Sequence, residues 1–162
     1  MKKVGIVMGS DSDLPVIQKA IAILNELEIP FEVHVFSAHR TPEQARTFSL
    51  EARDKGFGVL IAAAGMAAHL AGAIAANTTL PVIGIPCKGP VLDGLDALLS
   101  TVQMPSGIPV ATVGVNNGAN AALLAAEILS VGDAELTHRL QQKRERDTAA
   151  VLEKDAGIAA RL

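Results

Sequence analysis

The residues best suited to chemistry in this chain are His39 and Arg40, which follow one another in a short polar segment. Residues 31–36, just before them, are rich in β-branched and aromatic types, which is typical of a strand. Residues 41–44, just after them, predict a helix start with Thr41 as N-cap, a proline at N1 and a capping-box glutamine at N3. Ligands of open α/β sheets bind beyond the carboxyl ends of strands, so an imidazole beside a guanidinium here has a physical reason to take part in chemistry. The alternative is an ordinary surface loop that holds two polar residues.

A second candidate site follows the first strand. Residues 3–8 form an apolar run suited to a central strand, and a helix is expected over 14–28. Between them a glycine allows close backbone approach, Ser10 and Ser12 offer hydroxyls, and the free amides of the helix start favour an anion such as a phosphate. A carboxylate would repel that anion, so we assign Asp13 to sugar hydroxyls. Alternatively, Ser12 or Asp13 only caps the helix.

The third candidate is the small-residue segment 63–72. It follows an expected strand at 59–62 and opens a helix that ends near Asn77, with His69 in its first turn. The alanines and glycines let backbones pack closely, and Gly65 leaves room for a ligand above it. A lone histidine in an apolar helix is more often a buried core residue than a catalyst, so both interpretations of His69 stay open.

The one cysteine, Cys87, stands beside Lys88 in a loop expected after a fourth strand at 81–85. A neighbouring cation lowers the pKa of a thiol, which makes a nucleophile one interpretation of Cys87. Its other neighbours are small and apolar and no base is adjacent in sequence, so we disfavour that interpretation.

The composition excludes several classes of partner. With 14 basic and 17 acidic residues, a net charge of −3 and neither Trp nor Tyr, the chain has no broad basic face and no set of stacking rings for nucleic acid. A single cysteine cannot form an internal disulfide, and the N-terminal residues carry no signal-peptide pattern, so we expect a cytoplasmic protein. No unbroken apolar run approaches the ~20 residues that span a bilayer, so we expect no membrane partner.

The order of the elements predicts an α/β fold. At 162 residues we expect one domain, covering 1–162. Strands alternating with helices imply a three-layer α/β/α sandwich around a parallel five-stranded sheet, with the flavodoxin-like order 2-1-3-4-5. In that order the loops after strands one, two and three converge. The remaining elements are expected at 42–55, 93–102, 108–113 and 118–129.

A C-terminal helical extension is expected at about 133–155. Leu136 and Leu140 would give it an apolar stripe, because residues four apart lie on one face of a helix. Its charged segment 143–147 mixes both signs, and we interpret it as a solvated face.

Several segments together resemble the PurE family of purine biosynthesis. Residues 8–13, 37–42 and 64–70 resemble its three signatures, and residues 103–105 and 120–122 match later family segments. The resemblance covers nearly the whole chain, and the combination of motifs in this order is specific.

The resemblance implies a homo-octamer with active sites between subunits and an aminoimidazole ribonucleotide as ligand. Within the family, segment 67–70 resembles the bacterial-type mutase, which converts N5-carboxyaminoimidazole ribonucleotide to the isomer carboxylated at carbon 4 without ATP, biotin or metal. No cofactor is therefore expected. The resemblance implies His39 as the catalytic acid and base. It also implies a substrate-binding set, with Ser10 and Arg40 for the phosphate, Asp13 for the ribose, Ser37, Gly65 and His69 around the carboxylate, and Ser12 as a further member.

Two other functions stay open at this point. One is a carboxylase of the same family that adds free CO2 to aminoimidazole ribonucleotide. The other is a phosphate- or nucleotide-binding module with a flavodoxin-like fold and no catalytic activity.

Overall fold

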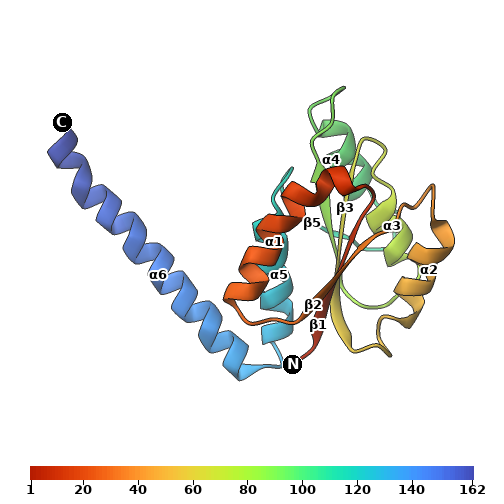
Figure 1. The fold of residues 1–162 in the computed structure, drawn as a ribbon, viewed down its shortest axis with the longest axis horizontal. Coiled ribbons are helices and arrows are strands. Elements are labelled where there is room, and N and C mark those ends of the chain that lie inside the picture. Colours follow the sequence, from red (N-terminus) through yellow and green to blue (C-terminus); the bar gives the residue numbers. More distant parts are fainter.

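The centre of the fold is a five-stranded parallel sheet in the order β2-β1-β3-β4-β5, seen in a computed structural model that describes all 162 residues (Figure 1). The predicted sheet order is confirmed. The strands are β1 (Lys3–Met8), β2 (Phe31–Val35), β3 (Phe57–Gly65), β4 (Val82–Cys87) and β5 (Ala111–Thr112).

Helices cover both faces of this sheet, so the predicted three-layer architecture is also confirmed (Figure 1). On one face lie α1 (Leu14–Glu26) and α5 (Gly118–Ser130). On the other lie α2 (Pro42–Glu51), α3 (Leu70–Ala75) and α4 (Leu95–Val102). The long α6 (Ala134–Ile158) follows α5 and projects away from the sheet, and 3-10 turns lie at Asp11–Asp13 and Ala159–Arg161.

The two helical layers explain why the central strands are apolar at nearly every position. Val4 and Ile6 of β1 pack into the core under α1 and α5, whereas Val7, the residue after Ile6, packs under α2 and α3. Successive side chains of a strand point to opposite faces, so both faces of β1 need apolar residues.

Helices α1 and α5 pack against each other without room for a side chain at Gly118. A Cβ at this position would lie 2.1 Å from the backbone oxygen of Val16, a distance that no real contact allows. Glycine at the first residue of α5 therefore sets how closely the two helices approach.

Two strands differ in length from the prediction. β4 continues past Ile85 to Cys87, because its pairing with β3 extends as far as Gly65 opposite Cys87. β5 is only two residues long instead of the predicted 108–113. It is an edge strand, and Pro109 just before it has no N–H to donate to a ladder.

The helix starts also differ from the prediction. β3 continues to Gly65, so α3 begins only at Leu70 and His69 is its N-cap residue. α4 begins at Leu95, because Asp93 and Gly94 have φ of 58° and 99°, in the left-handed region that a right-handed helix excludes. At their other ends, α1 and α2 finish two to four residues before the predicted 28 and 55.

The beginning of α6 matches the prediction. The Asp133 side chain caps the helix by accepting a hydrogen bond from the Leu136 amide at 3.0 Å. Leu136 is fully buried and Leu140 packs on the same core cluster, so the predicted apolar stripe is confirmed.

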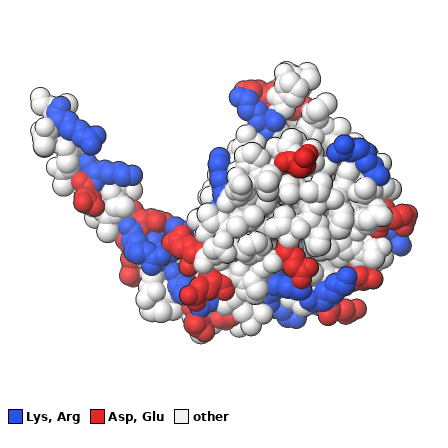
Figure 2. Space-filling view, in the orientation of Figure 1, with Lys and Arg blue, Asp and Glu red and all other residues white.

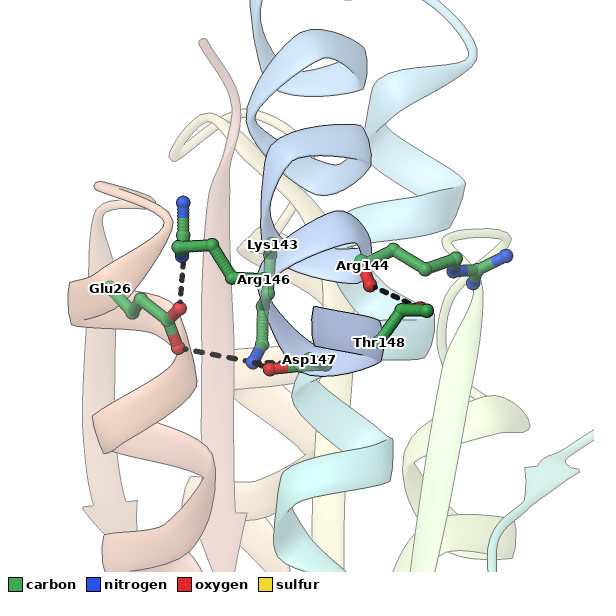
Figure 3. A network of polar contacts seen from close by, with 6 residues as sticks. All are labelled: Glu26, Lys143, Arg144, Arg146, Asp147 and Thr148. Carbon is green, nitrogen blue, oxygen red and sulfur yellow. Dashed lines mark hydrogen bonds and ion pairs between the residues drawn. The ribbon is translucent and has the colours of Figure 1, made fainter. Parts of the chain in front are cut away.

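The charged segment of α6 is mostly solvated, as predicted from the sequence, and Lys143 is the exception. Glu26 of α1 accepts from Lys143 at 3.3 Å and from Arg146 at 2.8 Å, and the Lys143 side chain is only 11% exposed (Figure 3). Burial alone would lower the pKa of Lys143, but Asp147 and Glu26 outweigh it and raise that pKa. Charges of both signs gather where α6 meets the rest of the molecule (Figure 2).

None of the helices combines the length and the apolar character needed to cross a membrane.

Gly118→Ala is expected to destabilise the protein by about 1–3 kcal/mol, because the added methyl group forces α1 and α5 apart. Urea unfolding at one fixed protein concentration measures this change. Gly132→Ala is the matched control, since a Cβ at Gly132 meets nothing within 4 Å. Equal stability of the two variants would contradict the close packing of α1 and α5.

Candidate active site

A cavity of about 560 Å³ opens at the carboxyl edge of the sheet. Its volume lies within the range of small-molecule sites. The loops after β1, β2, β3 and β4 all contribute to its lining. Every site residue predicted from the sequence lines this one cavity: Ser10, Ser12, Asp13, Ser37, His39, Arg40, Gly65 and His69.

The loop after β1 is shaped by the Ser10 hydroxyl. Its oxygen accepts hydrogen bonds from the Ser12 hydroxyl at 2.9 Å and the Ser12 amide at 3.3 Å, so Ser10 caps the 3-10 turn at Asp11–Asp13. Asp13 precedes α1 but makes no side-chain capping bond there. The alternative in which Ser12 or Asp13 caps the helix is therefore wrong, and the Asp13 carboxyl is left facing the cavity.

The Asp13 carboxyl is half-buried against the end of β4. Burial raises its pKa, although hydrogen bonds from the Cys87 thiol and the Ser10 backbone amide offset part of this effect. An ionised Asp13 is therefore disfavoured by its own surroundings unless a ligand supplies further hydrogen-bond donors.

Cys87 is not an activated nucleophile. It is 2% exposed, and burial together with the neighbouring Asp13 carboxylate raises the pKa of its thiol to about 12. Because the thiolate is the nucleophilic form, a thiol with this pKa is unreactive at neutral pH. The prediction that placed Cys87 in a loop missed that it ends a buried strand.

The loop after β2 is held by the Ser37 hydroxyl, whose oxygen accepts from the backbone amides of His39 at 3.3 Å and Arg40 at 3.2 Å. The Ser37 amide in turn donates to Thr41 Oγ1 at 2.8 Å. The expected capping box does not form, because the Thr41 hydroxyl is used in this loop and not on the first turn of α2. These bonds fix the backbone from which the His39 and Arg40 side chains reach the cavity.

The two histidines of the cavity contact each other directly. His39 Nε2 lies 2.8 Å from His69 Nδ1, and the rings meet edge to face with their centroids 5.0 Å apart. Both side chains are exposed, so the interpretation of His69 as a buried core residue is wrong. One of the two ring nitrogens must donate and the other accept, so the contact places a single N–H between the two imidazoles.

Arg40 connects the loops after β2 and β1. Its Nη2 donates to the Gly9 carbonyl at 2.8 Å. A guanidinium carries five N–H donors in a planar fork, so donors remain for an anion in the cavity after this bond is made.

The segment after β4 adds residues to the cavity that sequence reasoning did not assign to it, namely Lys88, Gly89 and Pro90. They could have been assigned to it from the general rule that ligands bind beyond the carboxyl ends of several strands, because they follow β4 directly. The Lys88 amide donates to Asn116 Oδ1 at 2.8 Å, which anchors this segment to the loop before α5. No three or more His, Cys, Asp or Glu side chains gather in an arrangement that could hold a metal ion.

The fold and this cavity define the class of doubly wound α/β proteins that bind a small molecule at the carboxyl edge of a parallel sheet. Within that class, the model of the AIR carboxylase family matches residues 3–150. The crystal structure of Treponema denticola PurE superposes with a TM-score of 0.83 at 31% sequence identity, covering 94% of this chain and 96% of the other. The chain belongs to the AIR carboxylase family, which confirms the resemblance found in its motifs.

Several relatives carry names within this family. The N5-carboxyaminoimidazole ribonucleotide mutase of Pyrococcus abyssi is 55% identical over 145 residues, covering 90% of this chain and 83% of that protein. The mutase of the same name from Thermotoga maritima is 51% identical over 154 residues, covering 95% and 90%. The phosphoribosylaminoimidazole carboxylase of Saccharomyces cerevisiae is 54% identical over 139 residues, covering 86% of this chain but only 24% of that protein.

Iodoacetamide is expected to leave Cys87 of the native protein unmodified at mildly alkaline pH, because the thiol is buried and protonated. Mass spectrometry follows the added carbamidomethyl group. The same reagent in concentrated guanidinium chloride, where the chain is unfolded, is the control and should label the thiol fully. Rapid labelling of the native protein would contradict the environment described for Cys87.

Asp13→Asn is expected to stabilise the ligand-free protein at neutral pH. The folded state raises the pKa of Asp13, so its contribution to stability is present below its unfolded value of 3.8 and is lost as the pH rises through the folded value. The difference in free energy of unfolding between the variant and the wild type should therefore widen as the pH rises from 3.8 through the folded pKa of Asp13, and stay constant above it.

Urea midpoints measured across the acidic and neutral range test the sign of this effect. Asp11→Asn is the control, because Asp11 belongs to the same 3-10 turn but is exposed and does not line the cavity. A difference in stability between Asp13→Asn and the wild type that narrows with rising pH would contradict the electrostatics described for the cavity.

Proposed function

We propose that this protein is an N5-carboxyaminoimidazole ribonucleotide mutase of purine biosynthesis. The observation that carries the proposal is its identity of 51–55% with mutases of that name along most of both chains. The reaction moves a carboxyl group from the exocyclic nitrogen of the imidazole to carbon 4 of the same ring. The cavity at the carboxyl edge of the sheet supports this proposal, since its size and polar lining suit a ribonucleotide.

The reaction needs one proton transferred to the substrate and one proton removed from it. Protonation of the carbamate nitrogen breaks the nitrogen–carboxyl bond and releases CO2, leaving an amine. Carbon 4 then attacks that CO2, and loss of the proton on carbon 4 restores the aromatic ring. We assign both transfers to His39, because an imidazole serves as acid and as base near neutral pH and is left in its starting form.

The other assignments follow the chemistry of each part of the substrate. Arg40 and Ser10 hold the phosphate, because the guanidinium has free donors beyond its bond to Gly9. Asp13 accepts from the ribose hydroxyls, which would supply the donors that its half-buried carboxyl lacks. Ser12 lies beside the sugar, and Ser37, Gly65 and His69 surround the carboxyl group during its transfer.

The role of Gly65 rests on space. A Cβ at this position would lie 3.3 Å from the backbone oxygen of Cys87, which is tighter than most real contacts. Without a side chain at Gly65, a planar ring and a CO2 molecule can lie directly over the backbone at the end of β3.

A second candidate is the carboxylase reaction with free CO2, favoured by the name of the yeast relative. The two reactions differ in the substrate that is consumed. The mutase converts the N5-carboxylated ribonucleotide without bicarbonate, whereas the carboxylase converts aminoimidazole ribonucleotide at low bicarbonate. A binding module without activity would convert neither.

A homo-octamer in the cytoplasm is part of the same proposal, supported by the family resemblance. Exposed apolar side chains follow one another along α4 at Leu95, Leu99 and Val102, with exposures of 52%, 47% and 47%. Residues at this spacing form one stripe on a helix, which suits contact with another copy of the chain.

The purified protein is expected to convert N5-carboxyaminoimidazole ribonucleotide to its carbon-4 isomer without ATP or bicarbonate. His39→Asn should lower kcat by about 10²–10⁴-fold, the usual contribution of a general acid and base, while substrate binding persists. His138→Asn is the matched control on the exposed surface of α6, where His138 only contacts Gln142. A wild-type protein that needs bicarbonate, or a His39→Asn variant with full turnover, would contradict the mutase mechanism.

A further inference from the structure

Lys88 is a cation of the cavity to which the mechanism above gives no role. It lies directly after β4, whereas Arg40 lies in the loop after β2. Two strands separate β2 from β4 in the sheet, so at ~4.8 Å per strand the two loops start roughly 14 Å apart. The cavity is therefore lined by a basic residue toward each of its two ends, Arg40 at one and Lys88 at the other.

The backbone of Lys88 is held in place while its side chain is exposed. Its amide donates to Asn116 Oδ1 at 2.8 Å. A Cβ at Gly94 would lie 3.3 Å from the Lys88 Cα, so the loop folds back closely on this residue. The Lys88 side chain is nevertheless 58% exposed and can reorient.

The ammonium group of Lys88 is paired with a carboxylate that does not line the cavity. Lys88 Nζ lies 2.8 Å from Asp93 Oδ1, and the Asp93 side chain is 75% exposed. Exposed ion pairs of this kind contribute little to stability, so another anion can take the place of Asp93 at small cost.

We propose that Lys88 is a substrate-binding residue whose ammonium leaves Asp93 and binds the carboxylate on the imidazole of the ribonucleotide. The position of Lys88 favours the carboxylate over the phosphate. Cys87, its neighbour in the chain, pairs with Gly65 at the end assigned to the carboxyl group, and a Cβ at Gly89 would lie 3.3 Å from Met66 Cγ in the loop after β3. The phosphate is assigned to Arg40 and Ser10, at the other end of the cavity. This inference rests on the proposed mutase function.

If the ammonium exchanges partners in this way, Lys88 and Asp93 have opposite effects on the affinity for the substrate. Lys88 attracts the substrate carboxylate, while Asp93 competes with that carboxylate for the same ammonium group. Removal of Lys88 therefore weakens binding and removal of Asp93 strengthens it. If the ion pair only stabilised the shape of the loop, both substitutions would weaken ligand binding.

Isothermal titration calorimetry of Lys88→Gln, Asp93→Asn and the double variant tests this exchange with two ligands. One ligand is the carbon-4 carboxylated ribonucleotide and the other is aminoimidazole ribonucleotide, which has the phosphate but no carboxylate. Asp93→Asn suits the backbone, because asparagine tolerates the left-handed φ of 58° at this position. Lys55→Gln is the control, since Lys55, just beyond α2, forms a similarly exposed pair with Glu51 at 2.7 Å and does not line the cavity.

For the carboxylated ligand we expect Lys88→Gln to raise Kd about tenfold, the loss of one charge-assisted contact. Asp93→Asn should lower Kd by about two- to fivefold, the range set by the weak exposed pair. The double variant should match Lys88→Gln alone. Binding of aminoimidazole ribonucleotide should change in none of these variants, and Lys55→Gln should leave both ligands unaffected.

Three results would overturn the inference while leaving the mutase function standing: an unchanged Kd in Lys88→Gln, a weaker complex in Asp93→Asn, or an equal loss for both ligands. The last would mean that Lys88 contacts the phosphate. A wild-type protein that does not convert the N5-carboxylated ribonucleotide would instead overturn the proposed function, and with it the inference.

Discussion

The geometry of the site depends on one constraint, the position of β1 between β2 and β3 in a fully parallel sheet. Parallel strands end at the same edge, so the loops after these three strands must share a small volume, although up to about 60 residues separate them in the chain. Apolar layers on both faces hold the strands in register, with β1 paired to β2 from Val4 to Met8 and to β3 along its whole length. A change that moved one strand by a residue would separate the loops that the chemistry needs together.

Polar side chains at this edge are satisfied by the backbone of the neighbouring loops and by one another. Ser37 holds the loop that carries His39 and Arg40, Arg40 binds the Gly9 carbonyl of the next loop, and His39 meets His69. Asp13 is the exception, because its half-buried carboxyl has only the Cys87 thiol and a backbone amide beside it. A half-buried polar group with too few partners raises the free energy of the empty site. Such a group contributes most to binding when a ligand supplies the missing hydrogen bonds.

The architecture and the set of residues that line the cavity could be predicted from the sequence, because both follow from local patterns. Alternating apolar strands and helices predict a parallel sheet, and polar residues after a strand must lie at its carboxyl edge. The contact between His39 and His69 could not be predicted, because it depends on two side-chain conformations 30 residues apart. The same holds for Lys143, whose burial depends on where α6 meets the end of α1, and for Asp93, whose left-handed backbone delays the start of α4 by two residues. Cys87 was placed in a loop because the strand was predicted to end at Ile85, whereas pairing with β3 carries it on to Cys87.

The central claim is that a carboxyl group is released and recaptured within one bound ribonucleotide, with His39 moving the proton. The most direct measurement is the fate of an isotopically labelled carboxyl group on N5-carboxyaminoimidazole ribonucleotide, converted in the presence of unlabelled bicarbonate. The account predicts that the label is retained at carbon 4 of the product. A product that carries the unlabelled carbon of the bicarbonate pool would show that the CO2 leaves the cavity, and would contradict the account.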